Sequence, residues 1–318
     1  MHSIANGWIW LGFSLFLVAA LVADTVLIGK VSRRSAGLVR TALAWTLFWI
    51  SCALIFNFGI WVYLYQTTTP AFAHVKALEF FTGYVIEKSL SVDNLFAFYM
   101  VFQQFHVPQQ YQHRVFSYGV WGAIIMRLAL ILVGVWLVSE FHWLLYVMGA
   151  FLFFTGLKMM FSNEKEKDLA ETLVIRLAKK FFNVTTEFHE EHFFIKQGVK
   201  WVATPLFLAL IFIEFSDLVF AMDSIPAIFA ITQDPFIVWS SNIFAILGLR
   251  ALYFVLARMI ERFHLLKVGI ALILVFVGVK MMIEPLYKMP VSLSLLAITS
   301  IIVLFTGLSV WQSSKKGV

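Results

Sequence analysis

Two stretches of this chain carry acidic side chains in the same spacing, within sequence that is otherwise apolar enough for lipid. In each stretch two acids lie six residues apart, and an amide or hydroxyl side chain follows the second acid. An ionised side chain at the centre of a bilayer costs about 3 kcal/mol on insertion scales, so such residues normally face a protein interior or a water-filled path. The pattern predicts one polar site built from two related halves. Its residues are Glu87, Asp93 and Asn94 in the first half and Asp217, Asp223 and Ser224 in the second.

A cation site is the chemistry that these residues favour. Glu214 lies three residues before Asp217, on the same face of a helix, and extends the acidic surface. Oxygen ligands suit Mg²⁺, Ca²⁺ or Mn²⁺ better than Zn²⁺ or Cu(I), and the motifs contain no Cys or His. The predicted metal ligands are Glu87, Asp93, Asn94, Glu214, Asp217, Asp223 and Ser224. The competing interpretation is that the acids form structural ion pairs with the intramembrane bases Lys88, Arg127 and Arg250.

A straight helix cannot aim both acids of a pair at one point. Six residues of α-helix leave the two side chains about 120° apart in azimuth and about 9 Å apart along the axis. Either the helix is interrupted near the acids, or the other half of the site supplies the missing wall. Pro226 follows Asp223 by three residues and removes a backbone N–H, which favours an interruption in the second half.

The composition is that of a polytopic membrane protein. Of 318 residues, 61% are apolar and 13% are charged, and one cysteine, Cys52, allows no disulfide framework. Apolar runs long enough to cross a bilayer, about 20 residues each, predict an all-α fold with about nine transmembrane helices. The runs are 7–29, 41–65, 78–102, 115–138, 143–161, 203–232, 236–257, 265–284 and 291–311.

Basic residues predict the orientation. Seventeen Lys and Arg fall in alternate connections and the C-terminal tail, whereas only Lys76 and Lys288 fall in the connections between them. Because Lys and Arg accumulate on the cytoplasmic side, we expect a periplasmic N-terminus and a cytoplasmic C-terminus in the inner membrane. The net charge of +6 thus reflects topology, and we expect lipid rather than nucleic acid as its partner.

The chain also repeats internally. Residues 141–160 match residues 263–282 without gaps, the paired acids recur at an offset of 130, and Arg127 recurs as Arg250 at an offset of 123. Each unit holds three helices, so the second unit enters the membrane from the opposite side, as in inverted-repeat transporters whose ligand site lies near the midplane. The predicted parts are 1–66 (helices 1 and 2), 67–161 (repeat unit one), 162–200 (cytoplasmic loop), 201–285 (repeat unit two) and 286–318 (helix 9 and cytoplasmic tail).

Other possible sites are weaker. His189 and His192 have a spacing that could hold a metal, but an exposed charged run is the commoner meaning of such a segment. Asp24 lies near the end of the first helix and is expected at the membrane interface. The sequence shows no phosphate loop, nucleotide fingerprint or nucleophile–base pair, so we expect neither an ATP-driven pump nor an enzyme, and no cofactor.

The acidic motifs carry a resemblance to a known family. The segments 87–94, 214–227 and 232–250 resemble the TerC family of integral membrane proteins, most closely its Alx-like branch, and the similarity runs from about 40 to 285. The resemblance implies an inner-membrane protein tied by family name to tellurium resistance and by some members to manganese export. It also implies that the acids named above are the metal residues.

These observations predict a secondary transporter that exports a divalent cation, with Mn²⁺ as the first candidate and Ca²⁺ as another. Uphill export without ATP needs a coupled ion, for which protons are the candidate. One alternative is a calcium/proton or other cation exchanger. Another is a membrane scaffold or sensor, linked to tellurium resistance, whose 162–200 loop docks partners while the acids form structural pairs.

Overall fold

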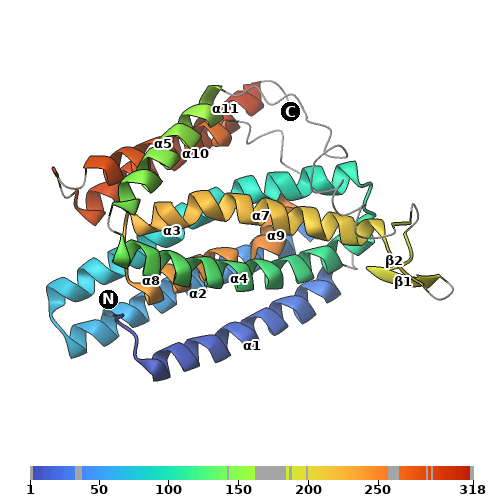
Figure 1. Ribbon diagram of the computed structural model, residues 1–318, viewed down its shortest axis with the longest axis horizontal. Helices are drawn as coiled ribbons and strands as arrows, with labels where there is room; N and C mark the ends of the chain where they lie inside the picture. The colour runs from blue at the N-terminus through green and yellow to red at the C-terminus, as the bar shows by residue number, and fades with distance from the viewer. Residues whose placement is uncertain are drawn as a thin grey trace.

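The computed structural model describes residues 3–32, 38–141, 143–161, 184–185, 188–197, 200–256, 265–283, 286–287 and 289–315. Some side chains within the helices lie outside this description, among them those of Asp93 and Asp223. The described chain is mostly helical (Figure 1). The helices are α1 (Gly7–Ser32), α2 (Leu38–Thr67), α3 (Pro70–Gln104), α4 (Gln109–Glu140), α5 (Leu144–Phe161), α7 (Pro205–Phe229), α8 (Pro235–Ile246), α9 (Leu249–Leu256), α10 (Leu266–Ile283) and α11 (Val291–Lys315), and the strands are β1 (Phe194–Gln197) and β2 (Lys200–Ala203).

The helices are those of a multi-pass membrane protein. Within the described residues, six helices are long and apolar enough to cross a bilayer, namely α1, α2, α4, α5, α7 and α11. Large apolar side chains also point outward from the bundle. Examples are Leu47, Ile125, Phe154 and Leu296, each more than 60% exposed. Such a surface is unfavourable in water but matches lipid, so the all-α membrane fold is confirmed.

Each predicted span falls on a helix, with one correction. The run 236–257 is not one helix, because α8 ends at Ile246 and α9 begins at Leu249. Gly248 between them has φ +80° and a Cβ there would lie 2.8 Å from the Trp49 side chain, so the break requires glycine. The total number of membrane crossings stays a prediction.

The expected interruption near Pro226 is wrong. Helix α7 runs unbroken from Pro205 to Phe229. Pro226 lies so close to the end of α7 that its missing N–H affects only the last turn, where Ala230 N donates to Pro226 O at 3.0 Å. Helix α3 is likewise continuous over 70–104. The helices therefore keep the acids of each pair on different azimuths, and the site must be completed by other helices.

Two polar clusters mark the two ends of the bundle. At one end, the Asp234 carboxylate caps α8 by accepting from Phe236 N at 2.9 Å and also accepts from Ile4 N at 2.8 Å. Thr232 nearby donates to Glu79 of α3 at 2.6 Å. At the other end, Arg114 of α4 lies 3.4 Å from Glu191, in the segment before the β1–β2 hairpin. The N-terminus, the start of α3 and the α7–α8 connection thus share one end, as the predicted topology requires.

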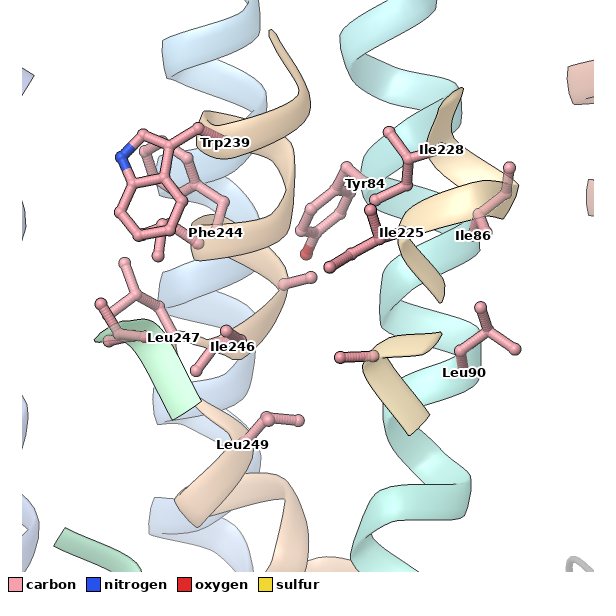
Figure 2. Packing of buried hydrophobic residues seen from close by; sticks show 14 of the residues in the cluster. Tyr84, Ile86, Leu90, Ile225, Ile228, Trp239, Phe244, Ile246, Leu247 and Leu249 are labelled. Atoms are coloured by element: carbon pink, nitrogen blue, oxygen red, sulfur yellow. The ribbon is translucent and has the colours of Figure 1, made fainter. Parts of the chain in front are cut away.

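The packing of the helices brings the two predicted repeat units together. Helix α3 contacts α7 and α8, α4 contacts α7, and α5 contacts α10 (Figure 1). Figure 2 shows Tyr84 of α3 and Ile225 of α7 between α3 and the α8–α9 segment. Helices α5 and α10 touch through glycine, since a Cβ at Gly278 would lie 2.6 Å from the Gly149 carbonyl oxygen. In these contacts the first helix of each predicted unit packs against the second helix of the other unit, and the two third helices pack together. The repeat itself stays a prediction.

Candidate functional site

A buried arginine lies at the centre of the predicted polar site. Arg127 of α4 is 1% exposed. Its Nη2 donates to Asp217 Oδ1 at 2.9 Å and its Nε to Asp217 Oδ2 at 3.1 Å, which is a bidentate ion pair. Its Nη1 donates to Glu87 Oε1 and, at 3.4 Å, to Asn242 Oδ1. One guanidinium therefore joins the first acid of each half of the predicted site.

The helical spacing explains which motif residues reach this arginine. Asn94 lies seven residues after Glu87, two turns along α3, and so shares its face. Its Nδ2 donates to Asp217 Oδ1 at 3.2 Å, across to α7. Ser224 has the same relation to Asp217 on α7 and is 2% exposed. The two helices thus present matching faces to one another, each with an acid and a neutral oxygen-bearing residue.

The site carries an excess negative charge and unpartnered oxygen atoms. Two carboxylates face one guanidinium, which leaves a formal charge of −1 on this cluster. Glu87 Oε2, Asn94 Oδ1 and Ser224 Oγ are buried and have no hydrogen-bond partner in the described part of the chain. Buried polar atoms normally find partners. Glu87 and Asn94 belong to the cluster, and unpartnered oxygens beside an excess negative charge fit a cation better than they fit a sealed apolar core.

Two of the predicted metal ligands form ion pairs with a buried arginine. Glu87 and Asp217 both pair with Arg127 in this state. No three His, Cys, Asp or Glu side chains among the described residues converge as a metal-binding group. Asp93 and Asp223 are helical, but their side chains lie outside the described residues. Their role as metal ligands therefore stays a prediction.

Glu214 lies beside this cluster rather than within it. It is partly buried on α7, and its carboxylate packs over Gly119 and Gly122 of α4. A Cβ at Gly122 would overlap both carboxylate oxygens, so this glycine makes the room that Glu214 occupies. Across the described residues no hydrogen bond joins Glu214 to Arg127. Glu214 is thus positioned next to the site, one helical turn from Asp217.

A second buried network involves residues whose role the sequence did not reveal. Asp24 of α1 is 5% exposed and accepts from Trp45 Nε1 at 2.9 Å and Trp49 Nε1 at 3.1 Å. It is the last residue of the apolar stretch of α1, and its position at the membrane interface stays a prediction. Arg250 of α9 approaches the same carboxylate, with Nη2 3.9 Å from Oδ2. Lys88 Nζ donates to the carbonyl oxygen of Ala245, at 3.0 Å, where α8 ends.

The histidine pair in the loop has a structural explanation. His192 N donates to the His189 carbonyl oxygen at 3.1 Å, so the two residues form a turn. Glu191 between them lies near His113 and Arg114 of α4. No third metal-binding side chain joins the pair among the residues that the structure covers. The arrangement agrees with an exposed charged run.

Comparisons with known proteins agree with these observations. Residues 72–317 match the family described as "Integral membrane protein TerC family". Over 315 residues the chain is 46% identical to the Escherichia coli K12 protein Alx, and the aligned region covers 99% of this chain and 98% of that protein. Alx of Photorhabdus laumondii is 43% identical over 316 residues, covering 99% and 98%. Both carry a provisional description as membrane-bound redox modulators.

A further relative has no described function. The chain is 45% identical over 299 residues to an uncharacterised membrane protein of Myxococcus xanthus, covering 93% of this chain and 90% of that protein. No solved structure matches the chain.

Proposed function

This chain belongs to the TerC family of integral membrane proteins, and we propose that it is a secondary transporter that exports a divalent metal cation, manganese, from the cytoplasm. The observation that carries this proposal is the buried cluster of Glu87, Asp217 and Arg127, which has one more carboxylate than cations. A soluble or scaffolding role gives no reason to bury an uncompensated negative charge, whereas a cation path requires one.

In this proposal the transported cation and Arg127 are alternative counter-ions. The guanidinium holds Asp217 through two hydrogen bonds and Glu87 through one. An arriving cation attracts the same oxygens, together with Glu87 Oε2, Asn94 Oδ1 and Ser224 Oγ, which are unpartnered in the described structure. In the empty site Arg127 therefore offsets the repulsion between the Glu87 and Asp217 carboxylates. When the cation binds, Arg127 must release at least one of them.

Manganese and proton coupling are the finer parts of the proposal. The ligand chemistry supports a hard cation with oxygen ligands, and the TerC resemblance supports manganese over calcium. Carboxylates bind a cation only when deprotonated, so proton uptake by these acids would release it. The chain has a single cysteine, so the redox description of its Alx relatives fits control of a redox-active metal ion more readily than thiol exchange.

The remaining expectations form part of the same proposal. We place the protein in the inner membrane as a multi-pass protein with a periplasmic N-terminus and a cytoplasmic C-terminus. It acts on a metal ion as substrate, with protons as coupling ions and lipid as surroundings, and has neither an enzyme activity nor a bound cofactor. The polar clusters at opposite ends of the bundle support this topology.

Flux measurements in proteoliposomes test the proposal. We expect Mn²⁺ flux that a pH gradient drives and that declines as pH falls, because protonated carboxylates no longer hold the cation. The variant Glu87→Gln keeps the shape of the side chain and its contact with Arg127, yet should lower the flux at least tenfold. The matched control Glu190→Gln changes an exposed loop acid and should leave the flux unchanged. Equal flux in all three proteins, or faster flux of Zn²⁺ than of Mn²⁺, would contradict the proposal.

A further inference from the structure

Arg250 is a buried arginine with an incomplete environment. It is 2% exposed, and its Nε and Nη1 have no hydrogen-bond partner among the residues that the structure describes. Its Nη2 lies 3.9 Å from Asp24 Oδ2, beyond hydrogen-bond distance. The Asp24 carboxylate is itself held by two tryptophan N–H groups. Leaving donors of a buried guanidinium unsatisfied is unfavourable. We therefore expect Nε and Nη1 of Arg250 to bind an acceptor in another conformational state.

Arg127 shows what a complete environment looks like at the related position of the other repeat unit. The two arginines lie 123 residues apart, at related positions of the two predicted repeat units. Each of Nε, Nη1 and Nη2 of Arg127 donates to an oxygen atom. Arg127 is therefore saturated and Arg250 is not, although the sequence relates them.

Glu87 belongs to the helix that adjoins Arg250. Its neighbour Lys88 donates from Nζ to Ala245 O at 3.0 Å and to Leu247 O at 3.4 Å, at the break between α8 and α9. Arg250 is the second residue of α9, directly after that break. Helices α3 and α9 are also in contact. Glu87 still has one carboxylate oxygen, Oε2, without a partner in the described structure.

We infer that the two arginines exchange partners during transport, so that Arg250 pairs with Glu87 in the opposite-facing state. In an inverted repeat the two units swap conformations when the protein reorients. The bond between Arg127 of α4 and Asp217 of α7 in the present state then predicts a bond between Arg250 of α9 and Glu87 of α3 in the other. Asp24, which lies outside the repeat, holds Arg250 in the present state. This inference rests on the proposed transport function.

Two buried probe positions can report the exchange. Cys52 is the only cysteine, so Cys52→Ser provides a background without reactive thiols. Ser241→Cys on α8 lies toward the Asp234 end, and Val115→Cys on α4 lies toward the Arg114 end; both residues are 0% exposed. Alkylation by a membrane-impermeant maleimide, applied from each side of membrane vesicles, then measures how often each end of the bundle opens.

The variants should shift the two probes in opposite directions. Arg127→Gln and Asp24→Asn each weaken the present state, so both variants should shift the probes in the same direction. Alkylation should rise at least threefold at the same one of the two cysteines in both variants and fall at the other. Arg250→Gln removes only the 3.9 Å contact with Asp24 from the present state but the whole ion pair with Glu87 from the opposite state, so it should give the reverse pattern. Arg250→Lys keeps the charge but not the bidentate geometry, so it should give a smaller shift of the same sign and serves if Arg250→Gln fails to insert. Arg40→Gln, at an exposed arginine of α2, is the matched control and should shift neither probe.

The outcomes separate this inference from the proposed function. If Arg250 and Arg127 variants move the probes in the same direction, or do not move them, the exchange is overturned even when Mn²⁺ flux is present. If the parent protein moves no Mn²⁺ while the opposite shifts are observed, the exchange stands and the metal assignment fails. Opposite shifts together with Mn²⁺ flux support both.

Discussion

Replacing the central arginine is the most direct test of the site. Arg127→Gln leaves the Glu87 and Asp217 carboxylates buried without their shared cation, so the formal charge of the cluster changes from −1 to −2. Removing one partner of a buried ion pair costs about 3–5 kcal/mol. With about 2–4 °C of midpoint shift per kcal/mol for a domain of 150–250 residues, we expect thermal unfolding in detergent to begin about 10 °C lower.

A double-mutant cycle shows whether the loss comes from the charge. Asp217→Asn alone should be milder than Arg127→Gln, because the remaining Arg127 and Glu87 still balance. The combination of both changes should recover part of the stability, with a coupling of about 1–3 kcal/mol for groups in direct contact. Intrinsic tryptophan fluorescence during a temperature ramp provides the measurement.

Manganese should distinguish Arg127→Gln from the parent. If the cation and Arg127 compete for the same oxygens, the variant binds Mn²⁺ more tightly, and Mn²⁺ at about one hundred times its dissociation constant adds about 2.7 kcal/mol of stability. Mn²⁺ should therefore restore more of the midpoint in Arg127→Gln than it adds to the parent. An Arg127→Gln protein as stable as the parent, or an equal response of both to Mn²⁺, would refute this account of the site.

Three further results are expected. Asp93→Asn and Asp223→Asn should each abolish manganese export while leaving membrane insertion intact, and full manganese resistance of cells that carry either variant would remove these acids from the mechanism. Alkaline phosphatase fused after Val318 should be inactive and fused near Gln233 active, and the opposite pattern would overturn the predicted topology. Asp234→Ala removes the cap of α8 and the acceptor of Ile4 N, so it should lower stability by about 1–2 kcal/mol, with little change in Mn²⁺ affinity by titration.

The membrane location of the chain and the positions of its helices follow from the sequence alone. A run of about 20 apolar residues satisfies its own backbone hydrogen bonds only as a helix in lipid, and this local requirement places helices at the predicted ranges. The cap of α8 at Asp234–Pro235 is equally local, because the Asp234 side chain accepts from Phe236 N and Ile237 N. The related faces of α3 and α7 also follow from spacing, because helical geometry sets the azimuth of Glu87 relative to Asn94.

The tertiary structure decided which charges meet. The predicted repeat relates Arg127 to Arg250, yet Arg127 joins Glu87 with Asp217 while Arg250 faces Asp24 of α1. The sequence also predicted a helix break near Pro226, whereas the break occurs at Gly248, against Trp49. Partner choice and helix breaks depend on how closely distant segments approach, and the period of a single helix carries no information about that distance.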